Sequence, residues 1–282
     1  MHVFTNKKDL QDHIKNTFIS SQSIGFVPTM GALHVGHISL VNKSLKENKL
    51  TIVSIFVNPT QFNNASDLDN YPRTLENDIT LLKKASHNII VFAPSAMQLY
   101  GGLPKSKKYN FEGLEDQMEG KYRSGHFDGV GTVLTLLFDA VKPTNAYFGE
   151  KDFQQLQIVK KLVEKEQMPV QIIGCEIYRE KNGLAFSSRN ERLTEEQRSE
   201  GKLLFDVLTK VKRSFGTKSV EELYEMVAQK FDNHPLFELE YFEIAATDDL
   251  KTVHTIEKHR EYRAFLAVFA DQVRLIDNIA LN

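Results

Sequence analysis

Short apolar runs alternate with longer amphipathic stretches from the start of the chain to about residue 180. The apolar runs predict strands at residues 23–29, 50–57, 88–94, 145–150 and 170–177. Most of these runs are continuous, as is typical of strands buried on both faces of a parallel sheet. The intervening stretches predict helices that begin near His37, Thr74 and Phe153. Because strand, helix and strand repeat, with right-handed crossovers, we expect an α/β fold with a doubly wound, Rossmann-like parallel sheet.

The hydrophobic pattern changes after about residue 180. Thr194 with Gln197, and Ser219 with Glu222, have the spacing of a capping box, so each pair predicts the start of a helix. Strand candidates then follow at 239–245, 263–270 and 273–281. Helices followed by strands predict a smaller α+β domain. We therefore place one domain at residues 1–178 and a second at 179–282.

Composition narrows the class of protein. The chain has 282 residues, 41% of them hydrophobic and 26% charged, which is ordinary for a globular protein. Its formal net charge of −2 gives no broad basic field, so no nucleic-acid partner is expected. Cys175 is the only cysteine, which excludes an intrachain disulfide and a cysteine-rich zinc site. No signal-peptide pattern or membrane-length apolar run is visible, so we expect a cytoplasmic protein without a membrane partner.

The segment "FVPTMGALHVGH" at residues 26–37 joins the first long predicted strand to a helix. Ligands of open α/β sheets bind beyond the carboxyl ends of the strands, and a helix N-terminus there favours anions. Gly31 and Gly36 allow a sharp turn and a close backbone approach. His34 and His37 add side-chain donors whose pKa values are readily tuned. The segment therefore favours binding of a triphosphate, although a packed core histidine and a weak zinc site remain alternatives from these residues alone.

Polar side chains follow other predicted strands at the same edge of the sheet. Asn58 and Gln61 follow the second long strand, and their neutral amides can bind hydroxyl and carboxylate groups. Lys151 and Asp152 stand at another junction of strand and helix, where a lysine can reach a phosphate. Arg189 follows two serines in a loop that could close over phosphate oxygens. Each of these segments could equally be a solvated turn if it is considered alone.

Taken together, these segments resemble the pantoate–β-alanine ligase family of the His-x-Gly-His nucleotidyltransferase superfamily. The resemblance extends over nearly the whole chain in the family's order and spacing. It rests on "PTMGALHVGH" (28–37), "SIFVNPTQF" (54–62), "YPRTLEND" (71–78), "GHFDGV" (125–130), "FGEKDFQQL" (148–156), "GLAFSSRN" (183–190) and "RLIDN" (274–278).

The resemblance implies a set of site residues. It implies catalytic roles for His37, His34 and Lys151, contacts of Gln61, Gln155 and Asn58 with pantoate, contacts of Arg123 and His126 with β-alanine, and a metal contact of Asp78. The ATP site that it implies consists of Met30, Gly31, Ala32, Leu33, His34, Val35, Gly36, His37, Gly149, Glu150, Lys151, Asp152, Tyr178, Phe186, Ser187, Ser188 and Arg189. Two positions depart from the family's pattern, since Phe186 replaces Leu or Met and Ser124 replaces a common proline.

The resemblance also implies a reaction. ATP and pantoate would give pantoyl adenylate and pyrophosphate, and β-alanine would then give pantothenate and AMP, with Mg²⁺ on the phosphates. The first domain would bind ATP and pantoate, the second would act as a lid, and the protein would be a homodimer. Another adenylyl transferase with a different acceptor, or a nucleotide sensor that has lost catalysis, are the alternatives.

Overall fold

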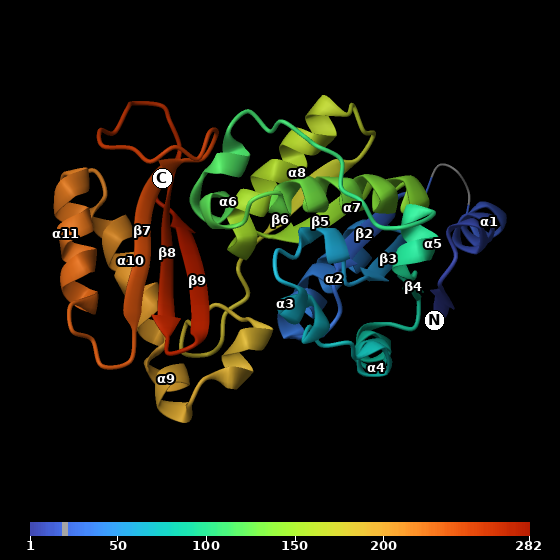
Figure 1. Cartoon of the computed structure of the whole chain (residues 1–282), viewed down its shortest axis with the longest axis horizontal. Helices are drawn as coiled ribbons and strands as arrows, with labels where there is room; N and C mark the ends of the chain where they lie inside the picture. The colour runs from blue at the N-terminus through green and yellow to red at the C-terminus, as the bar shows by residue number, and fades with distance from the viewer. Residues whose placement is uncertain (19–21) are drawn as a thin grey trace. The chain divides into compact units, whose positions relative to one another are not determined.

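The computed structural model describes residues 1–18 and 22–282, which form two compact units, Met1–Glu176 and Ile177–Asn282 (Figure 1). The boundary expected after residue 178 lies two residues beyond this division. Among the described residues, no helix combines the length and the apolar character that crossing a bilayer requires.

The first unit is built on a parallel sheet with the strand order β1-β4-β3-β2-β5-β6. Its strands are β1 (His2–Phe4), β2 (Ile24–Thr29), β3 (Leu50–Ile55), β4 (Ile89–Phe92), β5 (Asn145–Gly149) and β6 (Gln171–Cys175). The chain builds the sheet outward from β2 to β4 and then returns to place β5 on the other side of β2. This reversal creates a switch point between β2 and β5.

Helices cover both faces of this sheet. The helices of the first unit are α1 (Lys7–Thr17), α2 (Val35–Glu47), α3 (Ala65–Asp69), α4 (Leu75–Ala85), α5 (Ala96–Tyr100), α6 (Met118–Tyr122), α7 (His126–Val141) and α8 (Phe153–Lys165). Of these, α1, α2, α4, α7 and α8 contact the strands. Val27 and Val53 pack with Val41 of α2 and Leu82 of α4. The neighbouring Phe26 instead packs edge-on against Phe138 of α7, and α7 lies beside α8 (Figure 1). Because successive strand residues point to opposite faces, the continuous apolar runs fill both layers of the core.

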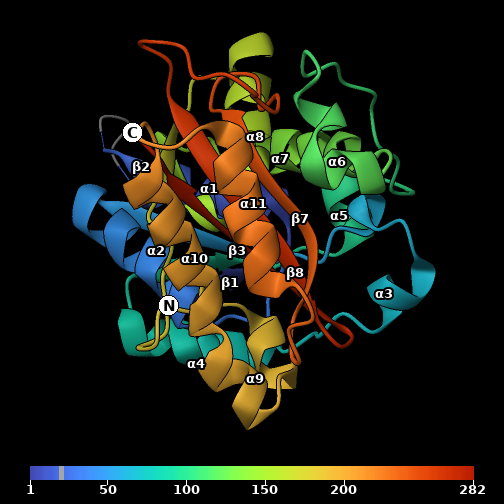
Figure 2. The same cartoon turned by 90° about the vertical axis from the view of Figure 1, so that its left-hand side faces the viewer.

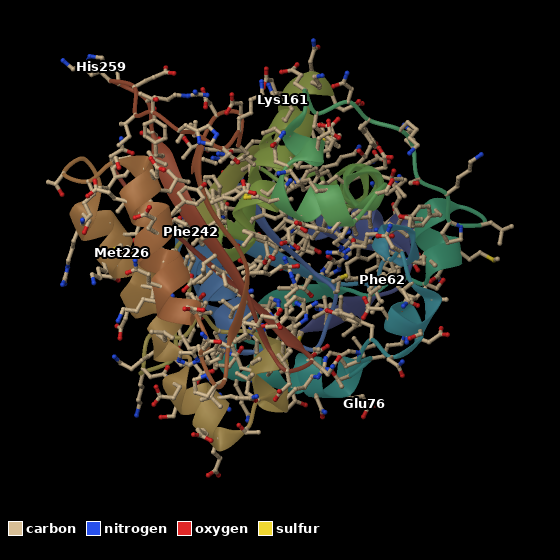
Figure 3. The ribbon with its side chains drawn as sticks, turned by 60° about the vertical axis from the view of Figure 1, so that its left-hand side comes forward. Phe62, Glu76, Lys161, Met226, Phe242 and His259 are labelled. Carbon is tan, nitrogen blue, oxygen red and sulfur yellow. The ribbon has the colours of Figure 1, made fainter. Side chains whose placement is uncertain are left out.

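The second unit carries an antiparallel sheet with helices packed on it. Its elements after the short 3₁₀ turn Ser188–Arg192 are α9 (Glu195–Glu200), α10 (Lys202–Ser214), α11 (Val220–Phe231), β7 (Glu238–Ala246), β8 (Tyr262–Ala270) and β9 (Val273–Ala280). The sheet order is β7-β8-β9. Figure 2 shows α10 and α11 side by side along this sheet. In Figure 3, Met226 lies on α11 and Phe242 on β7; Phe242 belongs to the core of this unit, and the partly buried Met226 packs against that core.

The expected fold class is confirmed, and so are the capping boxes of Thr194 and Ser219. The helices expected near His37, Thr74 and Phe153 begin at Val35, Leu75 and Phe153. The sequence prediction did not name β1, which has only three residues. It also did not name α7, whose buried residues surround the helix and so give no amphipathic stripe.

Candidate active site

The segment between β2 and α2 folds as a tight loop at the carboxyl end of β2. Gly31 has φ +85° and Ala32 has φ +49°, so two successive residues adopt the left-handed region. The Gly31 N–H donates to Thr29 Oγ1 at 3.2 Å. This loop brings the chain from the strand edge to His34, the N-cap of α2, within five residues. The first turn of α2 thus presents its backbone N–H groups at the switch point of the sheet.

Asp78 holds this loop in place from α4. Its carboxylate oxygens accept the N–H groups of Leu33 at 2.7 Å and Ala32 at 3.1 Å. Thr74 Oγ1 lies 3.3 Å from the same carboxylate, and Asp78 is only 2% exposed. The described part of the chain contains no group of three or more His, Cys, Asp or Glu side chains that could hold a metal ion. The contact of Asp78 with a metal stays a prediction, whereas its hydrogen bonds show that it supports the loop.

His34 and His37 form a stacked pair, with ring centroids 4.0 Å apart and 29° between the ring planes. The His34 N–H donates to His37 Nδ1 at 3.3 Å. Burial, followed by the positive charge of Lys151, lowers the pKa of His34 from 6.5 to about 4. Burial, followed by His34, lowers the pKa of His37 to about 3. Because Nδ1 of His37 accepts a hydrogen bond, the neutral ring carries its proton on Nε2 and can donate from there.

Lys151 lies in the short 3₁₀ turn Glu150–Asp152, directly after β5. Its charge acts on His34, so the segments after β2 and β5 meet at the switch point. The structure therefore brings together the histidine pair, the N-terminus of α2 and a lysine, as the sequence predicted. Gly149 ends β5 and Glu150 begins the 3₁₀ turn, while Met30, Val35 and Gly36 lie in or beside the loop before α2.

Asn58 fixes the conformation of Gln61 in the 3₁₀ turn Pro59–Gln61. Asn58 Nδ2 donates to Gln61 Oε1 at 3.0 Å and to the Gly129 carbonyl at 3.2 Å. Its Oδ1 accepts the hydroxyls of Tyr100 at 2.7 Å and Thr60 at 3.1 Å. With Oε1 occupied, Gln61 directs Nε2 toward Met30 Sδ, 3.2 Å away. Asn58 is 1% exposed, so in this structure it orients Gln61 as a donor.

His126 supports the same turn from the start of α7. Its Nδ1 lies 2.9 Å from the Gln61 carbonyl oxygen, and the residue is buried. Burial, followed by the charge of Arg123, lowers the pKa of His126 to about 4, while Asp152 and Glu119 act in the opposite direction. Arg123 and Asp152 are therefore close enough to His126 to interact with it electrostatically.

Two adjacent glutamines in the first turns of α8 differ in their surroundings. Gln154 is 4% exposed, donates to the carbonyls of Leu114 and Gln117, and accepts the N–H of Glu119. Gln155 is only partly buried. Gln154 thus orders the segment that leads to Arg123. No local signal in the sequence separated it from Gln155.

The remaining predicted ATP-site residues lie in the second unit. Phe186 N–H donates to the Tyr178 carbonyl at 2.9 Å, and the two rings meet edge to face at 6.1 Å. Ser187 is the N-cap of the 3₁₀ turn that contains Ser188 and Arg189, and its Oγ accepts the Arg189 N–H at 3.2 Å. The phenylalanine that departs from the family's pattern therefore packs on Tyr178.

The lowered pKa values predict a loss of stability in acid. His34, His37 and His126 have pKa values of about 4, 3 and 4 in the folded protein, against 6.5 as the reference value. At pH values between the folded and the reference pKa, these histidines bind more protons in the unfolded chain than in the folded protein. The free energy of unfolding therefore falls as the pH drops from about 6.5 toward 4. Urea titrations across this range should show the decrease, and His37→Gln should reduce its slope. A free energy that does not change with pH would contradict the burial of neutral histidines.

Gly129 is packed so closely that its replacement should disturb the turn that carries Gln61. An added Cβ would lie 2.4 Å from the Thr60 carbonyl oxygen and 2.8 Å from Gln61 Cα. Both are backbone atoms, so Gly129→Ala must displace the turn and should cost about 1–3 kcal/mol of stability. We expect kcat/KM for pantoate, the acid that the family resemblance implies, to fall on the order of 10²-fold. Gly102→Ala, which would contact nothing within 4 Å, is the control. Unchanged kinetics in Gly129→Ala would show that Gln61 does not depend on this packing.

The chain is similar to known proteins over almost its whole length. The family model of pantoate-beta-alanine ligase matches residues 2–280. The pantothenate synthetases of Flavobacterium psychrophilum and Christiangramia forsetii are 52% and 53% identical, over 100% of this chain and 100% of theirs. The crystal structure of pantothenate synthetase from Thermus thermophilus matches with a TM-score of 0.88 at 35% identity, covering 100% of this chain and 99% of that one.

A second crystal structure is that of the pantoate-beta-alanine ligase from Francisella tularensis, complexed with beta-gamma ATP and beta-alanine. It matches with a TM-score of 0.78 at 37% identity, covering 100% of this chain and 98% of that one. Family model, sequence relatives and solved structures all cover the chain almost from end to end. This chain therefore belongs to the pantoate–β-alanine ligase family.

Proposed function

We propose that this chain condenses pantoate with β-alanine at the expense of ATP. A carboxylate oxygen of pantoate attacks the α-phosphorus of ATP, and the bond to the β-phosphate oxygen breaks, giving pantoyl adenylate and pyrophosphate. The amine of β-alanine then attacks the acyl carbon of that mixed anhydride. AMP leaves with the electron pair of the broken acyl–oxygen bond, and the nitrogen loses a proton to give pantothenate.

The observation that carries this proposal is the meeting of His34, His37 and Lys151 at the switch point between β2 and β5. A triphosphate at the N-terminus of α2 receives backbone N–H groups, the Nε2–H of neutral His37 and the charge of Lys151. The N–H groups of α2 and His37 are fixed before substrate arrives, since Asp78 holds the loop that leads into α2. They stabilise the negative charge that passes to pyrophosphate as the bond breaks.

The acceptor is best explained as a small hydroxy acid. Gln61 offers Nε2 because Asn58 occupies its oxygen, and Met30 Sδ is a weak acceptor that a substrate oxygen can replace. Gln155 follows β5 on the same edge of the sheet. Such amides bind a hydroxyl and a carboxylate without burying a permanent charge. Arg123 supplies the positive charge for the carboxylate of β-alanine, and His126 holds the Gln61 backbone beside it.

Mg²⁺ enters this proposal as part of the nucleotide substrate. Each Asp78 carboxylate oxygen accepts one backbone N–H and keeps a lone pair, so Asp78 can contact the Mg²⁺ of the nucleotide, as the family resemblance implies. Mg²⁺ is commonly held by substrate phosphates with few protein ligands, and it neutralises their charge. For the second unit, the family resemblance implies that Ser187, Ser188 and Arg189 bind phosphate oxygens of the nucleotide and that Tyr178 and Phe186 bind its adenosine.

We also propose that the protein is a cytoplasmic homodimer, as the family resemblance implies. Sedimentation equilibrium of the purified chain tests the oligomeric state directly. A single species with the 32.2 kDa mass of one chain would show a monomer and contradict the proposed homodimer.

The experiment that tests the function is pantoate-dependent exchange of labelled pyrophosphate into ATP, with Mg²⁺ and without β-alanine. Exchange establishes the adenylate half-reaction and its acid substrate. Exchange with another carboxylic acid and not with pantoate would favour a different acceptor on the same scaffold. Tight ATP binding without exchange with any acid, and without AMP formation, would indicate a nucleotide sensor.

A further inference from the structure

Asp277 is the fourth residue of the "RLIDN" segment (274–278), and the proposed reaction assigns no role to it. It lies in β9 and its side chain is 1% exposed. Its carboxylate receives both terminal nitrogens of Arg179, Nη1 at 2.6 Å and Nη2 at 2.9 Å. The Arg179 guanidinium also lies 3.9 Å from the centroid of the Phe205 ring. A two-pronged and stacked pair with a buried carboxylate fixes the guanidinium in orientation as well as in place.

Arg179 lies in a short hairpin that leads to the predicted phosphate-binding residues. Phe186 N–H donates to the Tyr178 carbonyl at 2.9 Å, and Glu180 N–H donates to the Leu184 carbonyl at 2.8 Å. Arg179 and Ala185 form the bridge between the two arms. Arg179 Nη1 also donates to the Gly183 carbonyl at 3.0 Å, across the turn of the hairpin. The arginine therefore ties both the first arm and the turn to β9.

The second arm runs directly into Ser187, Ser188 and Arg189. Asn190, which is 1% exposed, donates to Glu180 Oε1 at 2.8 Å and to the Ala185 carbonyl at 3.1 Å. These bonds fasten the 3₁₀ turn Ser188–Arg192 back onto the hairpin. A displacement of the hairpin from β9 would therefore also displace the serine hydroxyls and Arg189.

We infer that Arg179 and Asp277 are positioning residues for the triphosphate: they lock the Ser187–Arg189 segment onto the sheet of the second unit. The inference rests on the proposed function, since it assumes that this segment binds ATP. It assigns no contact with substrate to Arg179 or Asp277. It also explains why an acidic residue is buried near the end of the last strand.

The inference predicts that breaking the pair impairs pyrophosphate exchange more than the reaction of pantoyl adenylate with β-alanine. Arg179→Lys keeps the charge but loses the two-pronged geometry, so kcat/KM for ATP in pyrophosphate exchange should fall about 10- to 10²-fold. Most of this loss should come from KM. The reaction of preformed pantoyl adenylate with β-alanine should lose less, because this intermediate keeps adenosine beside Tyr178 and Phe186 but carries no β- or γ-phosphate. Asp277→Asn removes the same pair from the other side and should reproduce the selective loss.

Arg260→Lys is the matched control. Arg260 lies in the same unit and pairs with Asp248 at 2.8 Å and Asp249 at 2.9 Å. Neither of these ion pairs involves the hairpin, so the replacement should leave both half-reactions unchanged. Thermal unfolding of each variant sets an assay temperature at which all are folded.

Equal losses in both half-reactions, or failure of both pair variants to fold, would show that the pair has only a structural role. Either result would overturn the inference. Unchanged KM for ATP in Arg179→Lys and Asp277→Asn would also overturn it. An unaltered protein that shows no exchange would instead remove the proposed function, and with it the positioning role.

Discussion

Replacing Lys151 by methionine is expected to lower the rate of pantoate-dependent pyrophosphate exchange by about 10²- to 10³-fold. Among the described residues, Lys151 is the only charged group whose charge lowers the pKa of His34. Methionine keeps the length and apolar stem of the side chain but cannot donate a hydrogen bond. Because the charge on the triphosphate rises at the oxygen that leaves, the loss should appear mainly in kcat.

Lys160→Met is the control for this experiment. Lys160 is exposed and lies on α8, the helix that follows Lys151, so the two variants lose the same charge from neighbouring elements. Its exchange rate should match that of the unaltered protein. Equal rates for all three proteins would show that Lys151 does not stabilise the leaving pyrophosphate.

The second large effect is expected at His37. His37→Ala removes the Nε2–H donor and should reduce exchange by about 10²-fold or more, as for the loss of one preorganised donor. His37→Asn keeps an N–H donor and should lose less. Since the pKa of His37 is about 3, the ring is neutral at pH 7 before ATP binds, and donation rather than a standing charge is its contribution. Near-normal pyrophosphate release by His37→Ala would remove its essential role.

The pH profile separates a neutral donor from a charged one. With pKa values of about 4 and 3, neither His34 nor His37 titrates between pH 6 and 8 in the free protein. We therefore expect kcat/KM for ATP to show no step from these residues over that range. His87→Asn, an exposed substitution, is the matched control for His37→Asn. A step near pH 6.5 that vanishes in His37→Asn would indicate a histidine that is charged when it acts.

Several features of the site could be expected from local sequence. The continuous apolar run of β2, the glycines after it and the histidine at the N-cap of α2 are adjacent in the chain. Each carries its own signal, and the repeated crossovers then indicate a parallel, doubly wound sheet. The same reasoning found the turn that carries Lys151, because it lies directly between β5 and α8.

Other features could not be expected from local sequence. Asp78 fitted the first turn of a helix and a metal contact equally well, and only the folded chain shows it bonded to Ala32 and Leu33. Gln154 and Gln155 are adjacent residues of the same type, so the sequence does not distinguish their surroundings. In the structure, Gln154 is bonded to the 114–119 segment and Gln155 is only partly buried. The helix α7 has no polar face, so its periodicity was hidden.

By itself, the sequence determined the class of fold, the family, and the residue types placed at the ends of β2, β3 and β5. These depend on contiguous patterns, which act through local backbone preference and burial. Only the tertiary structure decided which polar side chains bind one another and which remain for a substrate. Arg179 and Asp277 are 98 positions apart, and their pairing exists only after the second unit has folded. Such contacts join remote parts of the chain, so no local pattern encodes them.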